Sequence, residues 1–212
     1  MWVGKAVIFR WSIVAIIVLS AMIWGYFIII EGQERLTTLP FFGKPGNGEI
    51  HKVTDFSLVS QDGKTITQND FKNKIYVTDF FFVNCEGICP LMSDQLVRVA
   101  DAYKTNPDVL LLSHTVKPEE DSIPVLKQYA LNHNADPAKW HFVTGNKSEI
   151  NTLARTSYLL SNEEDDGGID FVHTQFFALV DPQKRIRGIY DGTDSTAVNK
   201  LITDIAILLR EE

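Results

Sequence analysis

The sequence predicts an α/β domain, in which a mixed β-sheet is flanked by helices, preceded by one N-terminal transmembrane helix. Three observations carry this prediction. An uncharged apolar run occupies residues 11–30, short apolar segments alternate with segments of helical periodicity after residue 53, and hairpin patterns stand at both ends of that alternation. Strands that alternate with helices form sheets whose two faces are both covered.

The apolar run WSIVAIIVLSAMIWGYFIII at residues 11–30 contains no charged side chain. Twenty helical residues span about 30 Å, the thickness of a bilayer's hydrocarbon core. A cleaved signal peptide is the alternative, but its apolar region is about 7–15 residues long and ends at a small-residue cleavage site. This run ends in YFIIIEGQ, which favours a retained anchor. Lys5 and Arg10 precede it, which places residues 1–10 in the cytoplasm and the rest of the chain outside.

The charge distribution separates the two sides of this predicted span. All 27 acidic residues follow residue 30, together with 18 of the 20 basic ones, so the exported part carries a net charge of −9. An acidic domain without a basic stripe argues against nucleic-acid binding. It fits a soluble head that is tethered to the inner membrane and lies in the periplasm or another extracytoplasmic space.

Residues 31–52 are rich in Gly, Pro and polar residues and are interpreted as a linker, and residues 53–212 form the predicted domain. The run IYVTDFFFV (75–83) is β-branched and aromatic with little alternation, which predicts a central strand covered on both faces. The other elements follow from the same patterns. Strands are expected in 53–67 (two, joined by a turn at 61–64), 108–116, 141–145 and 174–192 (a hairpin turning at 181–184), and helices over 90–105, 120–134, 148–160 and 196–212.

The chain's two cysteines, Cys85 and Cys89, stand in NCEGICPLM, at the turn from the central strand into the next helix. Backbone N–H groups and the helix dipole favour thiolate there. A structural disulfide is the alternative, but so short a loop would add little stability. Thiolates select copper(I), with zinc as a competitor. Asp79 lies inside the apolar run, where it either orients the cysteine loop or makes a structural hydrogen bond.

Two sulfurs leave a copper site short of a ligand, and an imidazole is the natural third. Of the five histidines, His51 lies in the linker, and His133 and His141 lie at a polar helix end and at the start of a short strand. His114 follows a strand that ends at the same edge as the cysteines, and His173 lies where a loop enters a strand. On placement alone, both remain candidates.

The segments TDFFFVNCEGICPLMSDQL, LLSHTVKPEEDSIPVLKQYA and DFVHTQFFALVDPQKRIRGIYDGT resemble the Sco/SenC family in the same order. The resemblance covers residues 50–210, and the N-terminal anchor also matches. It implies a thioredoxin-like fold, copper as the bound metal, and a role as a chaperone for the copper centre of cytochrome c oxidase. It also implies that Cys85, Cys89 and His173 are the metal ligands and that His114 is structural. Glu86 and Val172 depart from residues common in the family, but neither is a ligand position.

Two functions use the same cysteines. A metallochaperone would hold copper and pass it to the oxidase subunit that carries the copper centre, after a thiol reductant has reduced the cysteines. A thiol–disulfide oxidoreductase would instead reduce a partner's cysteines through a mixed disulfide, with Cys85 attacking and Cys89 resolving. Only the chaperone needs His173 as a ligand. A redox enzyme of this fold usually has a cis-proline near that position, and in this segment no proline precedes Thr174.

Overall fold

The structure is a computed structural model that describes residues 16–28, 38–43, 48–160 and 174–211. It consists of two compact units, Met1–Thr38 and Leu39–Glu212. In the first unit, a helix covers residues 16–28. No helix among the described residues combines the length and apolar character that a membrane crossing requires. The predicted anchor, residues 11–30, extends beyond the described helix at both ends and stays a prediction.

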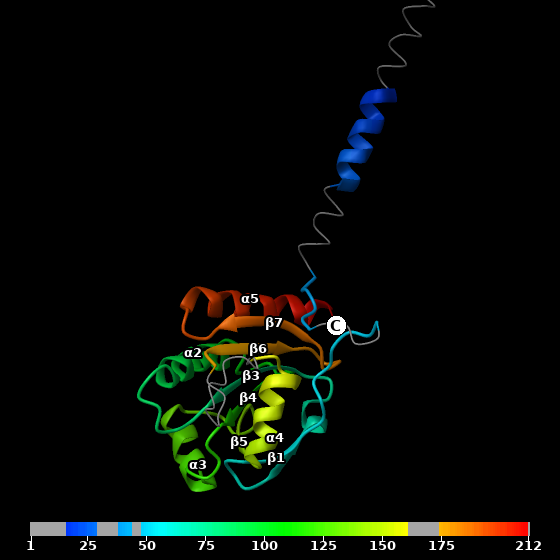
Figure 1. Cartoon of the computed structure of the whole chain (residues 1–212). Coiled ribbons are helices and arrows are strands. Elements are labelled where there is room, and N and C mark those ends of the chain that lie inside the picture. The colour runs from blue at the N-terminus through cyan, green and yellow to red at the C-terminus, as the bar shows by residue number, and fades with distance from the viewer. Residues whose placement is uncertain (1–15, 29–37, 44–47, 161–173, 212) are drawn as a thin grey trace, which may run out of the picture. The chain divides into compact units, whose positions relative to one another are not determined.

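The second unit is built on a seven-stranded mixed sheet in the order β2-β1-β5-β4-β3-β6-β7 (Figure 1). The three central strands β5, β4 and β3 are parallel, and the remaining neighbours pair antiparallel. This confirms the predicted mixed sheet with a central strand in the cysteine-bearing segment. The strands are β1 (Ser57–Ser60), β2 (Thr65–Thr67), β3 (Ile75–Phe81), β4 (Val109–Thr115), β5 (Trp140–Thr144), β6 (Phe176–Val180) and β7 (Ile186–Asp191).

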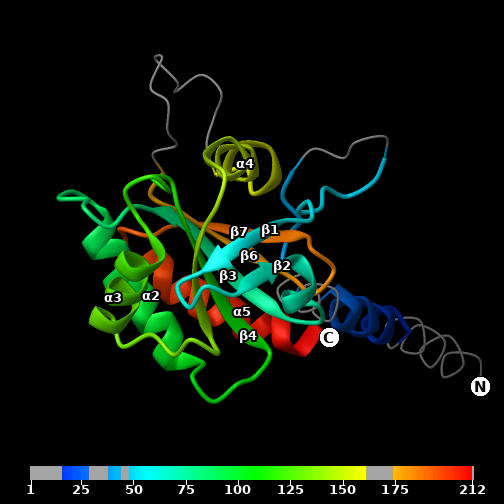
Figure 2. The ribbon, with the colours of Figure 1, turned by 90° about the horizontal axis from the view of Figure 1, so that it is seen from below.

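Helices cover both faces of the sheet, as Figure 2 shows with α4 on one side and α2, α3 and α5 on the other. The α-helices are α2 (Cys89–Ala102), α3 (Ile123–Asn132), α4 (Lys147–Thr152) and α5 (Ser195–Glu211). A short 3-10 helix, η1 (Gln68–Phe71), follows β2, and a π-helical turn, η2 (Leu153–Ser157), continues α4. The sequence predicted one helix over 148–160, and the π-helical turn within it was not anticipated.

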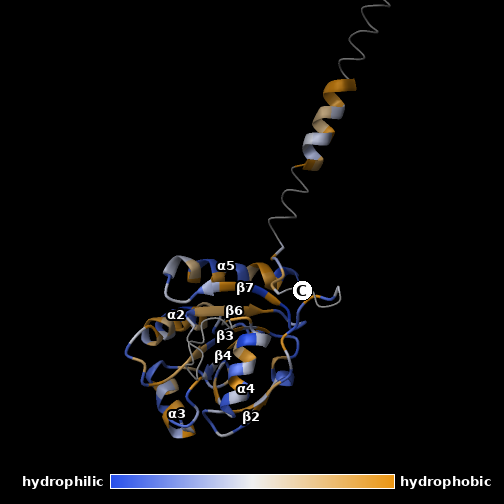
Figure 3. Ribbon diagram, in the orientation of Figure 1, coloured by the Kyte–Doolittle hydropathy of each residue, from blue (hydrophilic) through white to orange (hydrophobic). Residues whose placement is uncertain are grey.

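The sheet separates two hydrophobic cores. On β3, Ile75, Val77 and Phe81 face the core under α2, α3 and α5, while Tyr76 and Phe80 face the core under α4. Hydrophobic and hydrophilic residues alternate along α4 and α5 (Figure 3), so each of these helices buries one side. Because strand residues alternate between faces, the position of a residue on β3 or β4 decides which core it joins.

Local chemistry explains several boundaries. Thr67 and Asp70 form a capping box at η1, and Asn146 accepts the Glu149 N–H at the start of α4. The β6–β7 hairpin turns at 181–184 as predicted, with Lys184 in a left-handed conformation at φ 67°. The Asp181 carboxylate accepts backbone N–H groups across this turn, which stabilises it.

A buried arginine fastens the start of the second unit to its end. The Arg187 side chain on β7 is 2% exposed and donates to the carbonyl oxygens of Leu39 (2.7 Å) and Pro40 (3.3 Å). It also contacts the carboxylates of Glu211 (2.6 Å) and Asp181 (3.3 Å). Residues 39–43 and 48–52, which the sequence analysis assigned to a linker, therefore belong to the same compact unit as the sheet.

Candidate metal centre

The structure brings Cys85 and Cys89 together at the carboxyl end of β3. The strand ends at Phe81, a turn follows, and α2 begins at Cys89 with Pro90 in its first turn, where a missing N–H costs nothing. Both cysteines are free, and they are only 9% and 4% exposed. The tip of the turn, Glu86 and Gly87, is exposed. The sulfurs thus line the hydrophobic core beneath a turn that solvent or a partner can reach.

The two thiols differ in acidity. Burial acts to raise the pKa of Cys85, but hydrogen bonds from the Cys89 thiol and from the N–H groups of Cys89, Gly87 and Ile88 outweigh it, so this pKa is lowered. For Cys89, burial and the neighbouring Cys85 raise the pKa to about 12, against a hydrogen bond from the Phe82 N–H. The pair therefore carries its first negative charge on Cys85, so Cys85 is the more reactive of the two sulfurs.

Alkylation should distinguish the two sulfurs. With limiting iodoacetamide at pH 8, we expect the reduced chain to be labelled on Cys85 at least about tenfold more than on Cys89, because the thiolate is the reactive form. Fragmentation mass spectrometry of the peptide that contains both residues measures the ratio. In Cys89→Ala, Cys85 should react more slowly, since its sulfur loses the hydrogen bond from the Cys89 thiol. Equal labelling of both sulfurs would contradict this acidity order.

Below the cysteines, polar residues interrupt the hydrophobic core. Asp79 of β3 lies beside Ser113 of β4, and the Ser113 hydroxyl accepts a hydrogen bond from the Trp140 indole at 2.9 Å. Burial raises the pKa of Asp79 to about 7, although a hydrogen bond with Ser113 opposes the shift. Its Oδ1 atom has no hydrogen-bond partner among the described residues. The Asp79 side chain is 2% exposed and lies on the cysteine side of the sheet, the face that Val77 and Phe81 also occupy.

The comparisons with known proteins agree with this geometry. A model of the SCO1/SenC family matches residues 45–210. The chain belongs to this family. A Sco/SenC relative from Bacillus subtilis, named SCO1 protein homolog, is 32% identical over 73% of this chain and 81% of its own length.

Solved Sco structures share the fold. The structure of BsSco is 31% identical with a TM-score of 0.64, covering 74% of this chain and 93% of that one. It is described as a member of the Sco family of cytochrome c oxidase assembly proteins that contains a disulfide switch. ScoI of Arabidopsis thaliana, solved with copper bound, is 27% identical with a TM-score of 0.59, covering 76% of this chain and 99% of that one. The fold of this Sco/SenC chain is therefore thioredoxin-like, as expected.

The third ligand expected for a Sco/SenC site, His173, lies outside the described residues. Within the described part of the chain, no three His, Cys, Asp or Glu side chains are grouped closely enough to hold a metal ion. His114 is fully buried in the opposite core, stacked on Phe80 with ring centroids 4.7 Å apart. Burial lowers its pKa to about 3. Its placement agrees with the structural role inferred for it.

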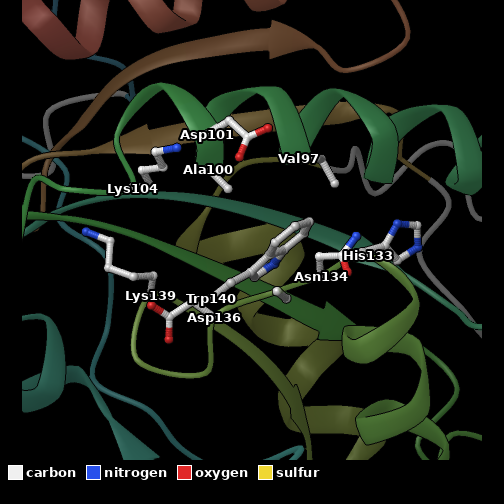
Figure 4. A pocket seen from close by; sticks show the side chains of 10 residues that line it. Val97, Ala100, Asp101, Lys104, His133, Asn134, Asp136, Lys139 and Trp140 are labelled. Atoms are coloured by element: carbon white, nitrogen blue, oxygen red, sulfur yellow. The ribbon is translucent and has the colours of Figure 1, made fainter.

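The other histidines are also accounted for. The His51 ring contacts the Ser157 carbonyl at 2.8 Å, and His141 packs edge-on against Phe71. His133 ends α3 and lines a cleft of about 190 Å³ between α2 and the segment joining α3 to β5. In Figure 4 the Trp140 indole lies between His133 and two lysines, Lys104 and Lys139. Neither cysteine lines this cleft.

One residue at the site was missed by the sequence analysis. Asp121 is 1% exposed and accepts the Val83 N–H two residues before Cys85. It stands in the run Glu119-Glu120-Asp121, which has the appearance of an exposed acidic helix start. No spacing in the sequence distinguishes the one buried carboxylate among the three.

Proposed function

We propose that this Sco/SenC chain is a membrane-anchored copper chaperone for cytochrome c oxidase. In this proposal, the thiolates of Cys85 and Cys89 and the imidazole of His173 hold one copper ion, which passes to the oxidase subunit carrying the copper centre. A thiol reductant keeps the cysteines able to bind. The N-terminal apolar segment holds the domain at the outer face of the inner membrane.

The observation that carries the proposal is the pair of soft sulfur donors at the carboxyl end of β3. The pKa of one of them, Cys85, is lowered. Such donors suit copper(I). The position of Thr174, just before β6, supports His173 as the third ligand. Because β6 runs antiparallel to β3, it begins at the edge of the sheet where the cysteines lie. His173 precedes Thr174 in the sequence. The copper-bound relative supports copper as the cargo.

Copper titration tests the proposal. The reduced full-length chain is expected to bind one copper(I) per chain in competition with a chromophoric chelator. His173→Ala should weaken binding at least about 100-fold, beyond the 10–100-fold typical of residues that only support a ligand. His133→Gln is the matched control and should bind as the unmodified chain does, because His133 lies at the end of α3 and lines a cleft without cysteines.

The alternative function is thiol–disulfide exchange. The opposite pKa shifts of the two cysteines favour it, since an attacking thiol is activated when its pKa falls. The disulfide switch described for BsSco is a related precedent. If His173→Ala keeps full copper affinity, or the reduced chain binds no copper while it reduces a model disulfide, this alternative replaces the chaperone proposal.

A further inference from the structure

Between the end of β3 and Cys85, the backbone N–H groups of Phe82 and Val83 form hydrogen bonds to two different partners. The backbone N–H of Phe82 donates to the Cys89 sulfur, and the next N–H, that of Val83, donates to Asp121 Oδ2 at 3.1 Å. Successive peptide groups thus hold the strand end to the second cysteine on one side and to a buried carboxylate on the other. The two peptide groups share the Phe82 Cα, so both contacts restrain the same residue.

The Asp121 carboxylate is itself held in place. The Thr115 hydroxyl at the end of β4 donates to the same Oδ2 atom. The Thr115 hydroxyl oxygen in turn accepts the Lys117 N–H at 3.1 Å, and the Asp121 N–H donates to the Lys117 carbonyl at 2.9 Å. The loop after β4 therefore folds back on itself and directs one carboxylate toward the cysteine segment.

Two further contacts attach this loop to the same strand end. The Val116 N–H donates to the Phe81 carbonyl at 2.8 Å, which extends the β3–β4 pairing by one residue. The Lys117 ammonium lies 4.6 Å from the centre of the Phe82 ring. Residues 81, 82 and 83 are each contacted by the loop 115–121, and Cys85 follows two residues later.

The Asp121 carboxylate does not act as the N-cap of helix α3. The N-cap residue of α3 is Ser122, and the side-chain oxygen of Asp121 is engaged by Val83 and Thr115 instead of the helix N–H groups. A buried carboxylate is costly unless it is hydrogen-bonded. Burial raises the pKa of Asp121, and the hydrogen bonds from Thr115 and Val83 oppose that shift. The two donors therefore keep the carboxylate in position at the strand end.

We propose that Asp121 is a positioning residue for the cysteine turn: through the Val83 N–H it holds residues 82–84 in the conformation that presents both sulfurs to one metal ion. The inference rests on the proposed copper-binding function. A turn held in its binding conformation loses less conformational freedom when the metal arrives, so it binds more tightly.

The test compares three variants of the full-length chain. Asp121→Ala removes the anchor, Asp121→Asn keeps a carbonyl oxygen that can accept the Val83 N–H, and Thr115→Val removes the other donor while leaving the Val83 contact. We expect Asp121→Ala to weaken copper(I) binding about 10–100-fold, the range for residues that orient ligands. Asp121→Asn should restore most of the affinity. Thr115→Val should lower stability to urea and weaken copper(I) binding less than Asp121→Ala does, because the Val83 contact remains.

Hydrogen exchange in the reduced, copper-free chain provides a readout that does not depend on copper. Amides 82–89 should exchange at least about tenfold faster in Asp121→Ala, with β4 and α5 unchanged, and at nearly the original rate in Asp121→Asn. If the alanine variant does not fold, Asp121→Ser, whose side chain is too short to span the same gap, takes its place. Unchanged exchange in 82–89, or a Thr115→Val chain that loses as much copper affinity as Asp121→Ala, overturns the positioning role. Failure of the unmodified chain to bind copper instead overturns the proposed function, and the exchange result still stands.

Discussion

The variant Arg187→Met is expected to lose about 3–5 kcal/mol of unfolding free energy, the range typical when one partner of a buried ion pair is removed. Methionine keeps most of the side chain's length but none of its donors. The carboxylates of Asp181 and Glu211 then lose a cation, and the carbonyl oxygens of Leu39 and Pro40 lose their hydrogen bonds. Buried acceptors without partners account for most of the expected loss.

Urea unfolding of the full-length chain, followed by circular dichroism, measures this change. Arg185→Met is the matched control, because Arg185 also contacts Asp181 and lies over the Phe41 ring, at 4.8 Å from its centre against 4.5 Å for Arg187. The Arg185 side chain is 23% exposed against 2% for Arg187, so its loss should cost about 1 kcal/mol or less, as for a partly solvated pair. Similar losses in both variants would show that burial does not distinguish the two arginines.

The same Arg187→Met variant should also release the segment 39–42. Two backbone N–H groups of this segment keep their hydrogen bonds, Phe42 to the Ile186 carbonyl at 2.9 Å and Leu39 to Glu211 at 2.8 Å. Limited proteolysis under native conditions is therefore expected to cut near Phe41 and Phe42 faster in this variant than in Arg185→Met.

Replacing Asp79 with asparagine is expected to stabilise the chain at pH 8 and to change how stability depends on pH. The folded pKa of Asp79 is about 7, above its usual 3.8, because burial disfavours the carboxylate. Between these values the folded state holds a proton that the unfolded state has released. The resulting stability is complete below pH 3.8 and is lost as the pH rises through about 7. Three pH units correspond to an upper limit of about 4 kcal/mol, which Asp79→Asn should regain at pH 8.

The contribution of His114 to stability changes with pH in the opposite direction to that of Asp79. Its folded pKa of about 3 lies below the usual 6.5, because its buried ring resists protonation. The stability that this shift contributes is complete above pH 6.5 and is lost as the pH falls toward 3. Between pH 4 and 6.5 the two residues therefore act in opposite directions, and the unmodified chain should show little dependence on pH from this pair.

Urea unfolding at pH 4, 5, 6, 7 and 8 separates the two contributions. Relative to the unmodified chain, Asp79→Asn should become more stable as the pH rises from 4 to 6.5, because, of the pair, only His114 then acts. Relative to the unmodified chain, His114→Gln should become less stable over the same window, because, of the pair, only Asp79 then acts. If the unfolding free energy of both variants depends on pH as that of the unmodified chain does, Asp79 and His114 do not make opposing contributions.

Much of this architecture could be predicted from local patterns. The run 75–83 was expected to be a central strand, and β3 lies between β4 and β6. The turn at 181–184 and the position of the cysteines between β3 and α2 were also expected. These features depend on residues that are neighbours in the chain, where apolar periodicity and turn chemistry leave few alternatives. The approach of His173 to the sulfurs remains a prediction that the copper titration decides.

The order of strands and helices, the site of the sulfur pair and the acidity of the domain were determined by the sequence alone, because each depends on composition or on short-range spacing. Only the tertiary structure decided which acid of the run 119–121 is buried beneath the cysteine segment and which face of the sheet receives His114. It also decided that Arg187 joins residues up to 148 positions away in the chain. The physical reason is that burial and hydrogen-bond partners are properties of the packed sheet, where a shift of one residue moves a side chain to the opposite core.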